Sequence, residues 1–386
     1  METRIISLKS PNLILAGIGA LQKMGEEAKN LDAKKALVVT DKIMIETGIE
    51  GQVSTVLAEN GVSVEIFDEV KSDPDIENCD ACLNMAKAGN YDLIVGVGGG
   101  SPMDIASIAS VMCTNSGTVY DYFGVNLIKK PGIPTFLITT TAGTGAEVTP
   151  NAILTDHKDQ LKKAIVSPYI LPRAAVIDPV LTLSMPPVVT SFTGMDALTH
   201  AIESYTSMNA TPLTDMYARE GIRLIAQSLR TAVNKGEKLE ARYDMSMGSL
   251  YAGISLANAG VGAVHALAYP LGGQFNVAHG IANGLLLPHV MEFNYIADVT
   301  KFAEVAKLMG ESVEGLSVTE QAQLSVQAVT DLINDIDMPT ALSQIDIPKD
   351  AIPRLSEAAI NVTRLMANNP RNMTVANAET IFKSAY

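Results

Sequence analysis

The sequence lacks the features that would mark a secreted or a nucleic-acid-binding protein. Its 386 residues include only three cysteines, a small and odd number that does not suit a disulfide framework. Two of them, Cys79 and Cys82, lie in a helical pattern with no second pair, so we expect buried thiols rather than a metal or redox site. Acidic residues outnumber basic ones by 42 to 28, which argues against binding to the phosphates of nucleic acids.

Long apolar runs are also missing. No stretch is uninterrupted over the roughly 18–20 residues that a membrane-spanning helix requires. The N-terminal segment contains Arg4 and Lys9 and lacks the apolar core and the small-residue cleavage site of a signal peptide. We therefore expect a cytoplasmic protein of about two domains, without membrane or nucleic acid partners.

The most unusual absence is a gap in the charge. Charged residues make up 18% of the chain, yet none occurs from Met245 to Met291. Gly, Asn and Pro residues interrupt this stretch, which argues against a membrane hairpin. Its only groups that ionise near neutral pH are His265, His279 and His289. The first two are flanked by small residues and are candidate metal ligands, whereas His289 is expected to be structural.

The first half of the chain alternates short runs of β-forming residues with helical patterns. Such alternation predicts a parallel sheet with helices on both faces, and such sheets bind ligands at the carboxyl ends of their strands. The predicted strands are Ala36–Thr40, Ser63–Phe67, Leu93–Val97, Thr135–Thr139 and Ala175–Ile177, and amphipathic stretches include Asp41–Asn60 and Ile76–Lys87.

After Pro186-Pro187 the strand patterns end and only helical patterns follow. Ser317 and Thr374 are predicted N-caps, and Glu320 stands at the capping-box spacing from Ser317. We predict an α/β domain over residues 1–185 and an all-α domain over residues 186–386. The predicted helices of the second domain are Thr190–Met208, Pro212–Asn234, Leu239–Ala259, Ala297–Met309, Val318–Ile336, Ile352–Leu365 and Val375–Ser384.

A glycine-rich turn, Gly98-Gly99-Gly100-Ser101, follows one of the predicted strands. Its glycines let backbone N–H groups approach a ligand closely, and a helix that starts near Pro102 favours a phosphate at its N-terminus. The spacing is not GxGxxG, so a tight turn without a ligand is an equally good interpretation of this motif alone.

Two further segments favour a dinucleotide. Residues 139–145, TTTAGTG, follow another strand and offer hydroxyl groups and flexible backbone to a phosphate or a ribose. Asp41 follows the strand ALVVT, where a carboxylate can accept hydrogen bonds from a ribose diol and would repel a 2′-phosphate, which predicts NAD over NADP. The alternative for Asp41 is that it caps the following helix.

Asp196 and His200 are four residues apart in a helical stretch and therefore share one face. Alone, this spacing is more typical of a hydrogen bond on a helix surface. With His265 and His279 it gives one carboxylate and three imidazoles, a plausible ligand set for a divalent first-row metal with a position left open for substrate.

The order of these motifs resembles that of the iron-containing (group III) alcohol dehydrogenases, the relatives of lactaldehyde reductase and bacterial methanol dehydrogenase. Short glycine motifs alone would be weak evidence, but this many motifs in unbroken order from end to end are specific. The markers are GGGSPMD at 98–104, TTTAGTGAEVTPN at 139–151, IDP at 177–179, TGMDALTHAIE at 193–203, NAGVGAVHALAYPLGG at 258–273, AHGIANGLLLPHV at 278–290 and NPR at 369–371.

The resemblance implies a dinucleotide-binding α/β domain and an all-α domain of the dehydroquinate synthase-like architecture, with the active site in the cleft between them. It implies NAD, with NADP less expected, and Fe(II) or sometimes Zn(II), held by Asp196, His200, His265 and His279. The residues implied for the cofactor are Asp41, Gly99, Gly100, Ser101, Asp104, Thr140, Thr141, Thr144, Thr149, Asn151 and Lys162, with Lys163 as the adjacent alternative to Lys162.

The implied activity interconverts a small alcohol or hydroxy acid and its aldehyde or ketone by hydride transfer at a metal-bound oxygen, in a homo-oligomeric enzyme. The side chains implied for the pocket, Leu256 and Leu365 with Asn151 nearby, suit a small apolar substrate. Arg364 and Arg371 could bind an acid, although surface salt bridges are the more ordinary expectation. A metal- and NAD-dependent lyase of the dehydroquinate synthase type is the alternative enzyme, and a nucleotide-binding protein without catalysis is the least favoured interpretation.

Two positions depart from the family pattern. Many members have a second His four residues after the third metal ligand, where this chain has Tyr269, so our hypothesis is that the Tyr269 hydroxyl donates the proton instead. Members with Tyr there include some that act on short hydroxy acids such as 4-hydroxybutyrate. The second departure is Ser72-Asp73-Pro74, where several relatives have Asn before Pro, and it suggests a different contact with the cofactor.

Overall fold

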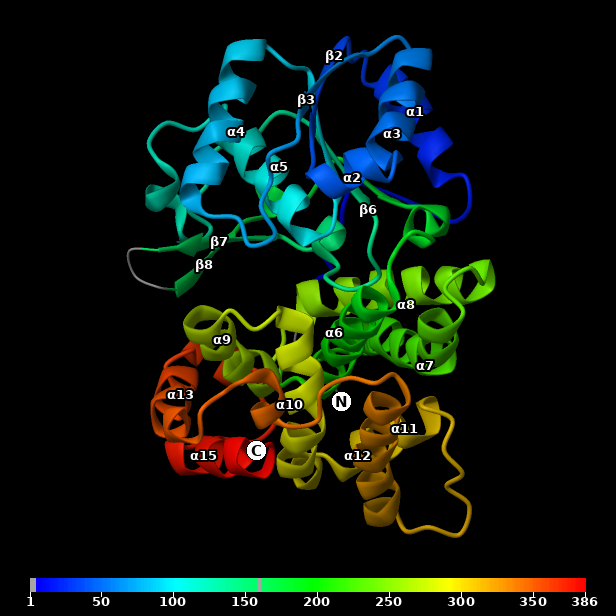
Figure 1. Ribbon diagram of the computed structural model, residues 1–386, viewed down its shortest axis with the longest axis vertical. Helices are drawn as coiled ribbons and strands as arrows, with labels where there is room; N and C mark the ends of the chain where they lie inside the picture. The colour runs from blue at the N-terminus through cyan, green and yellow to red at the C-terminus, as the bar shows by residue number, and fades with distance from the viewer. Residues whose placement is uncertain (1–4, 158–160) are drawn as a thin grey trace. The chain divides into compact units, whose positions relative to one another are not determined.

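The structure is a computed structural model that describes residues 5–157 and 161–386. The chain packs as two compact units, Lys9–Ser184 and Met185–Tyr386, and residues 5–8 group with the second (Figure 1). The first unit is α/β, and the described residues of the second contain helices and 3-10 turns but no strand. The predicted fold class is therefore confirmed, while the assignment of NAD to the first unit and metal to the second stays a prediction.

A six-stranded parallel sheet forms the centre of the first unit. Every neighbouring pair of its strands is parallel, as predicted, so the carboxyl ends of the strands share one edge. From side to side the strands are β1 (Leu13–Ala16), β9 (Ala174–Ile177), β6 (Thr135–Thr139), β4 (Leu93–Gly98), β2 (Lys35–Val39) and β3 (Ser63–Phe67).

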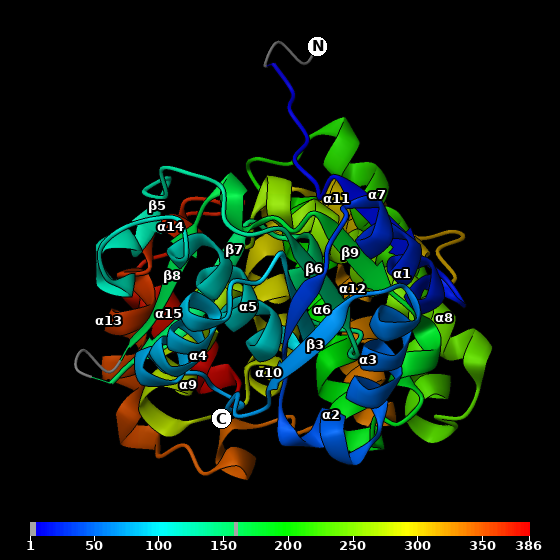
Figure 2. The same ribbon diagram turned by 90° about the horizontal axis from the view of Figure 1, so that it is seen from above.

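Helices cover both faces of this sheet, and successive strand residues enter opposite cores. Leu37 packs with one pair of helices, α4 and α5, and its neighbour Val38 packs with the other pair, α1 and α3. Figure 2 shows the two pairs on either side of the strands. Cys79 and Cys82 are buried in the first core, as predicted, and burial raises the pKa of both thiols. The helices are α1 (Ala20–Asn30), α3 (Ile49–Glu59), α4 (Ile76–Gly89) and α5 (Gly100–Met112).

Two parts of this unit differ from the prediction. The stretch Asp41–Asn60 is two helices, α2 (Lys42–Glu46) and α3, because Gly48 adopts φ +74° between them, a left-handed conformation that interrupts a helix. The sequence also fails to predict β1 and a small second sheet of β5 (Gly124–Val125), β7 (Asn151–Asp156) and β8 (Leu161–Val166). In that sheet β7 and β8 pair antiparallel, and β5 pairs parallel with β8.

The second unit confirms the predicted helices except Ile352–Leu365, which is two helices, Ile352–Ile360 and Thr363–Met366, with a break at Asn361 and Val362. Helices α7, α8 and α15 have the predicted bounds. Ser317 and Thr374 cap α12 and α15, since their hydroxyl oxygens accept hydrogen bonds from the N–H groups of Glu320 and Asn377. The helices are α6 (Pro187–Thr206), α7 (Pro212–Asn234), α8 (Leu239–Ala259), α9 (Ala263–Phe275), α10 (His279–Asn294), α11 (Val299–Leu308), α12 (Val318–Asp335), α13 (Ile352–Ile360), α14 (Thr363–Met366) and α15 (Val375–Ser384).

The charge-free stretch Met245–Met291 folds into most of α8, all of α9 and most of α10. The sequence predicts neither α9 nor α10, because both are apolar on most of their circumference and lack the one-sided pattern of a surface helix. Within the described residues, no single helix is long and apolar enough to span a membrane. Helices α8 and α9 pass that test of length and composition only as a pair, and they are bent by 100°.

Close packing of α10 on α6 depends on a glycine. The backbone of Gly280 lies so near α6 that a Cβ atom there would be 2.3 Å from the carbonyl oxygen of Phe192. A backbone oxygen moves less readily than a side chain, so α10 needs glycine at this position to reach α6.

We expect Gly280→Ala to lower the free energy of unfolding by about 1–3 kcal/mol, because the added methyl group overpacks the contact between α6 and α10. Thermal and chemical denaturation measure the change. Gly51→Ala on α3 is the matched control, since a Cβ there meets nothing within 4 Å and alanine favours a helix. A Gly280→Ala protein as stable as the wild type would contradict this account of the packing.

Candidate functional site

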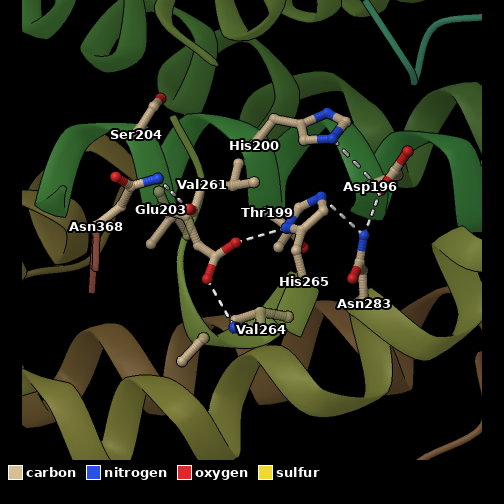
Figure 3. Close-up of polar contacts among 12 residues, drawn as sticks. Asp196, Thr199, His200, Glu203, Ser204, Val261, Val264, His265, Asn283 and Asn368 are labelled. Carbon is tan, nitrogen blue, oxygen red and sulfur yellow. Dashed lines mark hydrogen bonds and ion pairs between the residues drawn. The ribbon is translucent and has the colours of Figure 1, made fainter. Parts of the chain in front are cut away.

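The four predicted metal ligands come together in the second unit. Asp196 and His200 lie on one face of α6, His265 lies in the first turn of α9 and His279 begins α10. One possible ligand atom from each residue lies within 4.8 Å of those of the other three. Figure 3 shows the Asp196 carboxylate near the rings of His200 and His265. Three helices thus deliver one carboxylate and three imidazoles to one point.

The rings of the three histidines pack directly against one another. The ring centroids of His200 and His265 are 4.8 Å apart, and those of His265 and His279 are 5.2 Å apart. The Nε2 atoms of His200 and His279 lie 3.8 and 3.9 Å from Oδ1 of Asp196. Asp196, His200 and His265 are buried, whereas the His279 side chain is 37% exposed, so a small molecule can reach the set at His279.

The electrostatics of Asp196 favour its charged form. Burial of this carboxyl would by itself raise its pKa. The imidazoles of His200, His279 and His265 and the amide of Asn283 outweigh burial and hold the pKa of Asp196 below its usual value. A buried carboxylate that stays ionised suits a cation-binding site.

Asn283 is a member of this cluster that the sequence did not predict. Its Nδ2 donates a hydrogen bond to Oδ1 of Asp196 over 2.7 Å and lies 3.1 Å from Nε2 of both His265 and His279. Its Oδ1 is buried and has no hydrogen-bond partner among the described residues. The lone pairs of three candidate ligand atoms therefore converge on one donor group. This arrangement fits a divalent cation, because the same lone pairs would coordinate it.

Tyr269 lies beside the ligand set. Its ring centroid is 6.2 Å from that of His279. Burial raises the pKa of Tyr269, and the Arg364 guanidinium, which hydrogen-bonds with the hydroxyl, offsets part of that effect. The expectation of surface salt bridges is wrong for Arg364 and Arg371, since neither forms an ion pair within the described residues. Arg371 instead donates to the carbonyl oxygen of Phe293 over 2.6 Å.

In the first unit, the two predicted phosphate loops lie side by side. The glycine turn connects β4 to α5, and residues 139–145 follow β6, the neighbour of β4 in the sheet. A Cβ atom on Gly100 would lie 3.3 Å from the Thr144 side chain, and one on Gly99 would lie 3.7 Å from that of Thr141. The hydroxyl oxygen of Thr141 is buried, and no residue in the described part of the chain hydrogen-bonds with it. This edge therefore combines glycine backbone with one hydroxyl group that the described residues leave unused, as a phosphate site requires.

Asp41 acts as the helix cap that was the alternative interpretation. It is the N-cap of α2, and its Oδ1 accepts a hydrogen bond from the N–H of Met44 over 3.1 Å. Burial raises the pKa of Asp41, and the N–H groups of Met44 and Ile43 offset only part of this effect. The cap uses one carboxylate oxygen, so Oδ2 can still accept a hydrogen bond from a ribose.

The remaining predicted cofactor residues occupy the same unit but have partners of their own. Burial raises the pKa of Asp104 to about 8, although its Oδ2 accepts a hydrogen bond from the N–H of Ile153. Lys162 forms an ion pair with Asp73 over 2.7 Å, which joins β8 to the loop that departs from the family pattern. The Ser101 hydroxyl donates a hydrogen bond to the Ser72 carbonyl, and the N–H of the buried Thr140 donates to the Gly98 carbonyl. Thr149 is buried after a 3-10 turn, and Asn151 begins β7.

Glu147, which the sequence did not single out, is a buried carboxyl in the second of these loops. Its side chain is almost wholly buried, and one of its oxygens has no hydrogen-bond partner within residues 5–157 and 161–386. Burial raises the pKa of Glu147 to about 7, so the group is partly protonated at neutral pH. The only feature of the sequence that could have drawn attention to Glu147 is its place inside the motif TTTAGTGAEVTPN.

Comparison with known proteins relates both units to one group of enzymes. The model of the iron-containing alcohol dehydrogenase family matches residues 11–179, and the model of its C-terminal part matches residues 190–386. The chain is 40% identical to 1,3-propanediol dehydrogenase of Citrobacter freundii over the whole of both chains. It is 37% identical to NAD-dependent methanol dehydrogenase of Bacillus methanolicus, over 97% of this chain and 98% of that one. The structure of a 1,3-propanediol oxidoreductase superimposes with a TM-score of 0.97 at 39% identity, covering 99% of this chain and all of the other.

Removal of His265 tests the ligand set directly. We expect His265→Ala to lose at least about tenfold in affinity for a divalent metal, because one of four converging ligand atoms disappears. Calorimetric titration of the metal-free protein with Zn²⁺ measures this affinity. His289→Ala is the matched control from the same charge-free stretch, since His289 contacts Ser384 on α15 and not the cluster. Equal affinity in the wild type and His265→Ala would refute the assignment.

Proposed function

The chain belongs to the iron-containing alcohol dehydrogenase family, and we propose on this premise that it is an NAD-linked enzyme whose metal is held by Asp196, His200, His265 and His279. As a member, it is an oxidoreductase that interconverts alcohols and aldehydes. The convergence of these four side chains within 4.8 Å is the observation that carries the proposal. We propose Fe(II) as the metal, with Zn(II) as the alternative, because imidazole and carboxylate ligands suit both.

The metal and the nicotinamide would supply the chemistry that no side chain can, namely a Lewis acid for the substrate oxygen and a hydride donor or acceptor for the substrate carbon. The chain itself provides a buried and ionised Asp196, which keeps a negative charge among the imidazoles. The stretch Met245–Met291, which spans α9 and most of α8 and α10, also contains no Lys or Arg that would compete with a metal for Asp196.

We assign the proton donor to Tyr269. Its raised pKa keeps the hydroxyl protonated at neutral pH, and its ring lies next to that of His279, the exposed member of the ligand set. A protonated hydroxyl beside the site can donate to a substrate oxygen during reduction and accept the proton again during oxidation. Arg364 lowers the cost of that exchange, since its positive charge stabilises the phenolate.

We propose that the coenzyme is NAD and that it binds at the edge formed by Gly99, Gly100, Thr141 and Thr144. The Asp41 carboxylate supports NAD over NADP, because it would repel a 2′-phosphate. The relative from Bacillus methanolicus is called NAD-dependent, which agrees with this proposal. We also propose that the enzyme is a homo-oligomer.

We propose a small alcohol as the substrate. Leu256, Leu365 and Tyr269 belong to one apolar cluster beside the ligand set, which suits a short apolar chain. The names of the relatives, methanol and 1,3-propanediol dehydrogenase, agree with this size. A short hydroxy acid is the second candidate, because Arg364 contacts Tyr269 and forms no ion pair in the described part of the chain.

The substrate class is tested by a panel of methanol, 1,3-propanediol and 4-hydroxybutyrate, assayed by NADH absorbance with metal content measured on the same preparation. We expect turnover of at least one small alcohol with NAD. If 4-hydroxybutyrate is the better substrate, Arg364→Gln should raise the KM for this acid about tenfold and leave the KM for the diol unchanged, since only the acid needs the guanidinium. No turnover of any alcohol, hydroxy acid or aldehyde would overturn the proposed function.

The coenzyme assignment is tested by Asp41→Gly. Loss of the carboxylate should raise the ratio of kcat/KM for NADP to that for NAD by about tenfold, equivalent to roughly 1.4 kcal/mol, while glycine still tolerates the N-cap position. Asp298→Gly is the matched control, because Asp298 caps α11 in the same way and belongs to the other unit. An unchanged ratio in Asp41→Gly would mean that another group discriminates between the coenzymes.

A further inference from the structure

Glu203 is a buried carboxylate one step removed from the candidate metal ligands. Its Oε2 lies 2.5 Å from Nδ1 of His265, and its Oε1 accepts a hydrogen bond from the backbone N–H of Val264 over 2.7 Å (Figure 3). Glu203 lies on α6, whereas Val264 and His265 belong to the first turn of α9. One side chain thus holds both the start of α9 and the ring of a ligand.

The two oxygens of Glu203 have fixed roles. A backbone N–H can only donate, so Oε1 must accept from Val264. Oε2 of a carboxylate can only accept, so the proton of the neutral His265 ring is held on Nδ1. The other ring nitrogen, Nε2, then presents a lone pair toward Asn283 and the remaining ligands. The contact with Glu203 therefore selects the tautomer of His265 that can bind a metal.

The local sequence makes room for this contact. Glu203 follows Asp196 by seven residues and His200 by three on α6, so the three residues share one face of the helix. A Cβ atom on Gly262 would lie 3.3 Å from Oε1 of Glu203 and 3.1 Å from Oδ1 of Asn369, which is tighter than ordinary contacts. Asn369 Oδ1 also accepts a hydrogen bond from the N–H of Ala263. Glu203 and Asn369 thus bind two of the N–H groups in the first turn of α9 that have no partner within the helix.

We propose that Glu203 is a positioning residue for the metal site: it fixes the ring orientation and the tautomer of His265 and thereby raises the affinity of the site for a divalent metal. The inference rests on the proposed function, because it assumes that His265 is a ligand. It goes beyond a helix cap, since a cap requires only the contact with Val264. The contact of Oε2 with His265 Nδ1 is the observation that a cap does not explain.

Glu203→Gln separates these two roles while it keeps the shape of the side chain. The fixed N–H of Val264 claims the oxygen of the new amide, so the amide nitrogen faces Nδ1 of His265 and donates to it. The ring proton then moves to Nε2, the nitrogen that faces the other ligands. We expect a Kd for Zn²⁺ and for Co²⁺ that is about 10–100-fold higher than in the wild type, with little change in thermal midpoint.

The tautomer itself gives a readout that does not involve a metal. Nitrogen-15 NMR of the imidazoles distinguishes the two neutral forms, and the chain has only five histidines. In the metal-free wild type we expect the His265 proton on Nδ1, and in Glu203→Gln on Nε2. Glu203→Ala should bind metal more tightly than Glu203→Gln, because without a side-chain donor the ring can still adopt the favourable tautomer.

Matched variants make each outcome decisive. Glu292→Gln, the same change at an exposed position of α10, should leave the Kd unchanged. Gly262→Ala keeps every polar group and crowds Oε1, so it should weaken binding by less than Glu203→Gln and serves if Glu203→Gln fails to fold. A wild-type Kd or an Nδ1 proton in Glu203→Gln, or weaker binding in Glu203→Ala than in Glu203→Gln, overturns the proposal. Wild-type binding in His265→Ala would instead overturn the ligand assignment beneath it.

Discussion

The close approach of α6, α9 and α10 is the constraint on which the rest of the second unit depends. Four candidate ligand atoms within 4.8 Å require three backbones to come near one another, and large or charged side chains at the contacts would hold them apart. Gly280 lies against the Phe192 carbonyl, and a Cβ on Gly284 would lie 3.1 Å from that of Met195. The lack of charge from Met245 to Met291 follows from the same requirement, because these helices are buried on nearly all sides.

The buried polar groups of this region form one connected system rather than separate pairs. Asn369 binds the N–H of Ala263 and also exchanges two hydrogen bonds with the amide of Asn294, at the end of α10. Together with Glu203 it fixes where α9 begins. The NPR motif therefore has a structural role at the site. Its Asn369 holds the start of α9, the helix that carries His265 and Tyr269, although it contacts neither of these two side chains.

The sequence predicted what depends on local pattern and missed what depends on tertiary contact. Amphipathic α7 and capped α15 were found with their bounds, while α9 and α10, which contain Pro270 and Pro288 and have no polar face, were not. The four candidate ligands were found because Asp196 and His200 share one helix face, and because His265 and His279 stand in a charge-free stretch. The resemblance to a known family then joined them into one set. Asn283 and Glu203 occur at helical spacing from His279 and His200, but the contacts that reveal their role, with Asp196 and with His265, join different helices, so spacing alone carried no signal.

Glu203 and Asn283 act on the same lone pair from opposite ends of the His265 ring. Glu203 leaves Nε2 without a proton, and the Asn283 amide then approaches that nitrogen and two further acceptors with only two hydrogens. This amide cannot satisfy all three acceptors at once, and its own oxygen has no partner in the part of the chain that the structure describes. Buried acceptors that share too few donors are costly, and a cation that coordinates all three relieves the cost. The arrangement of these residues thus fits a divalent cation, because the lone pairs of the candidate ligands converge on one point.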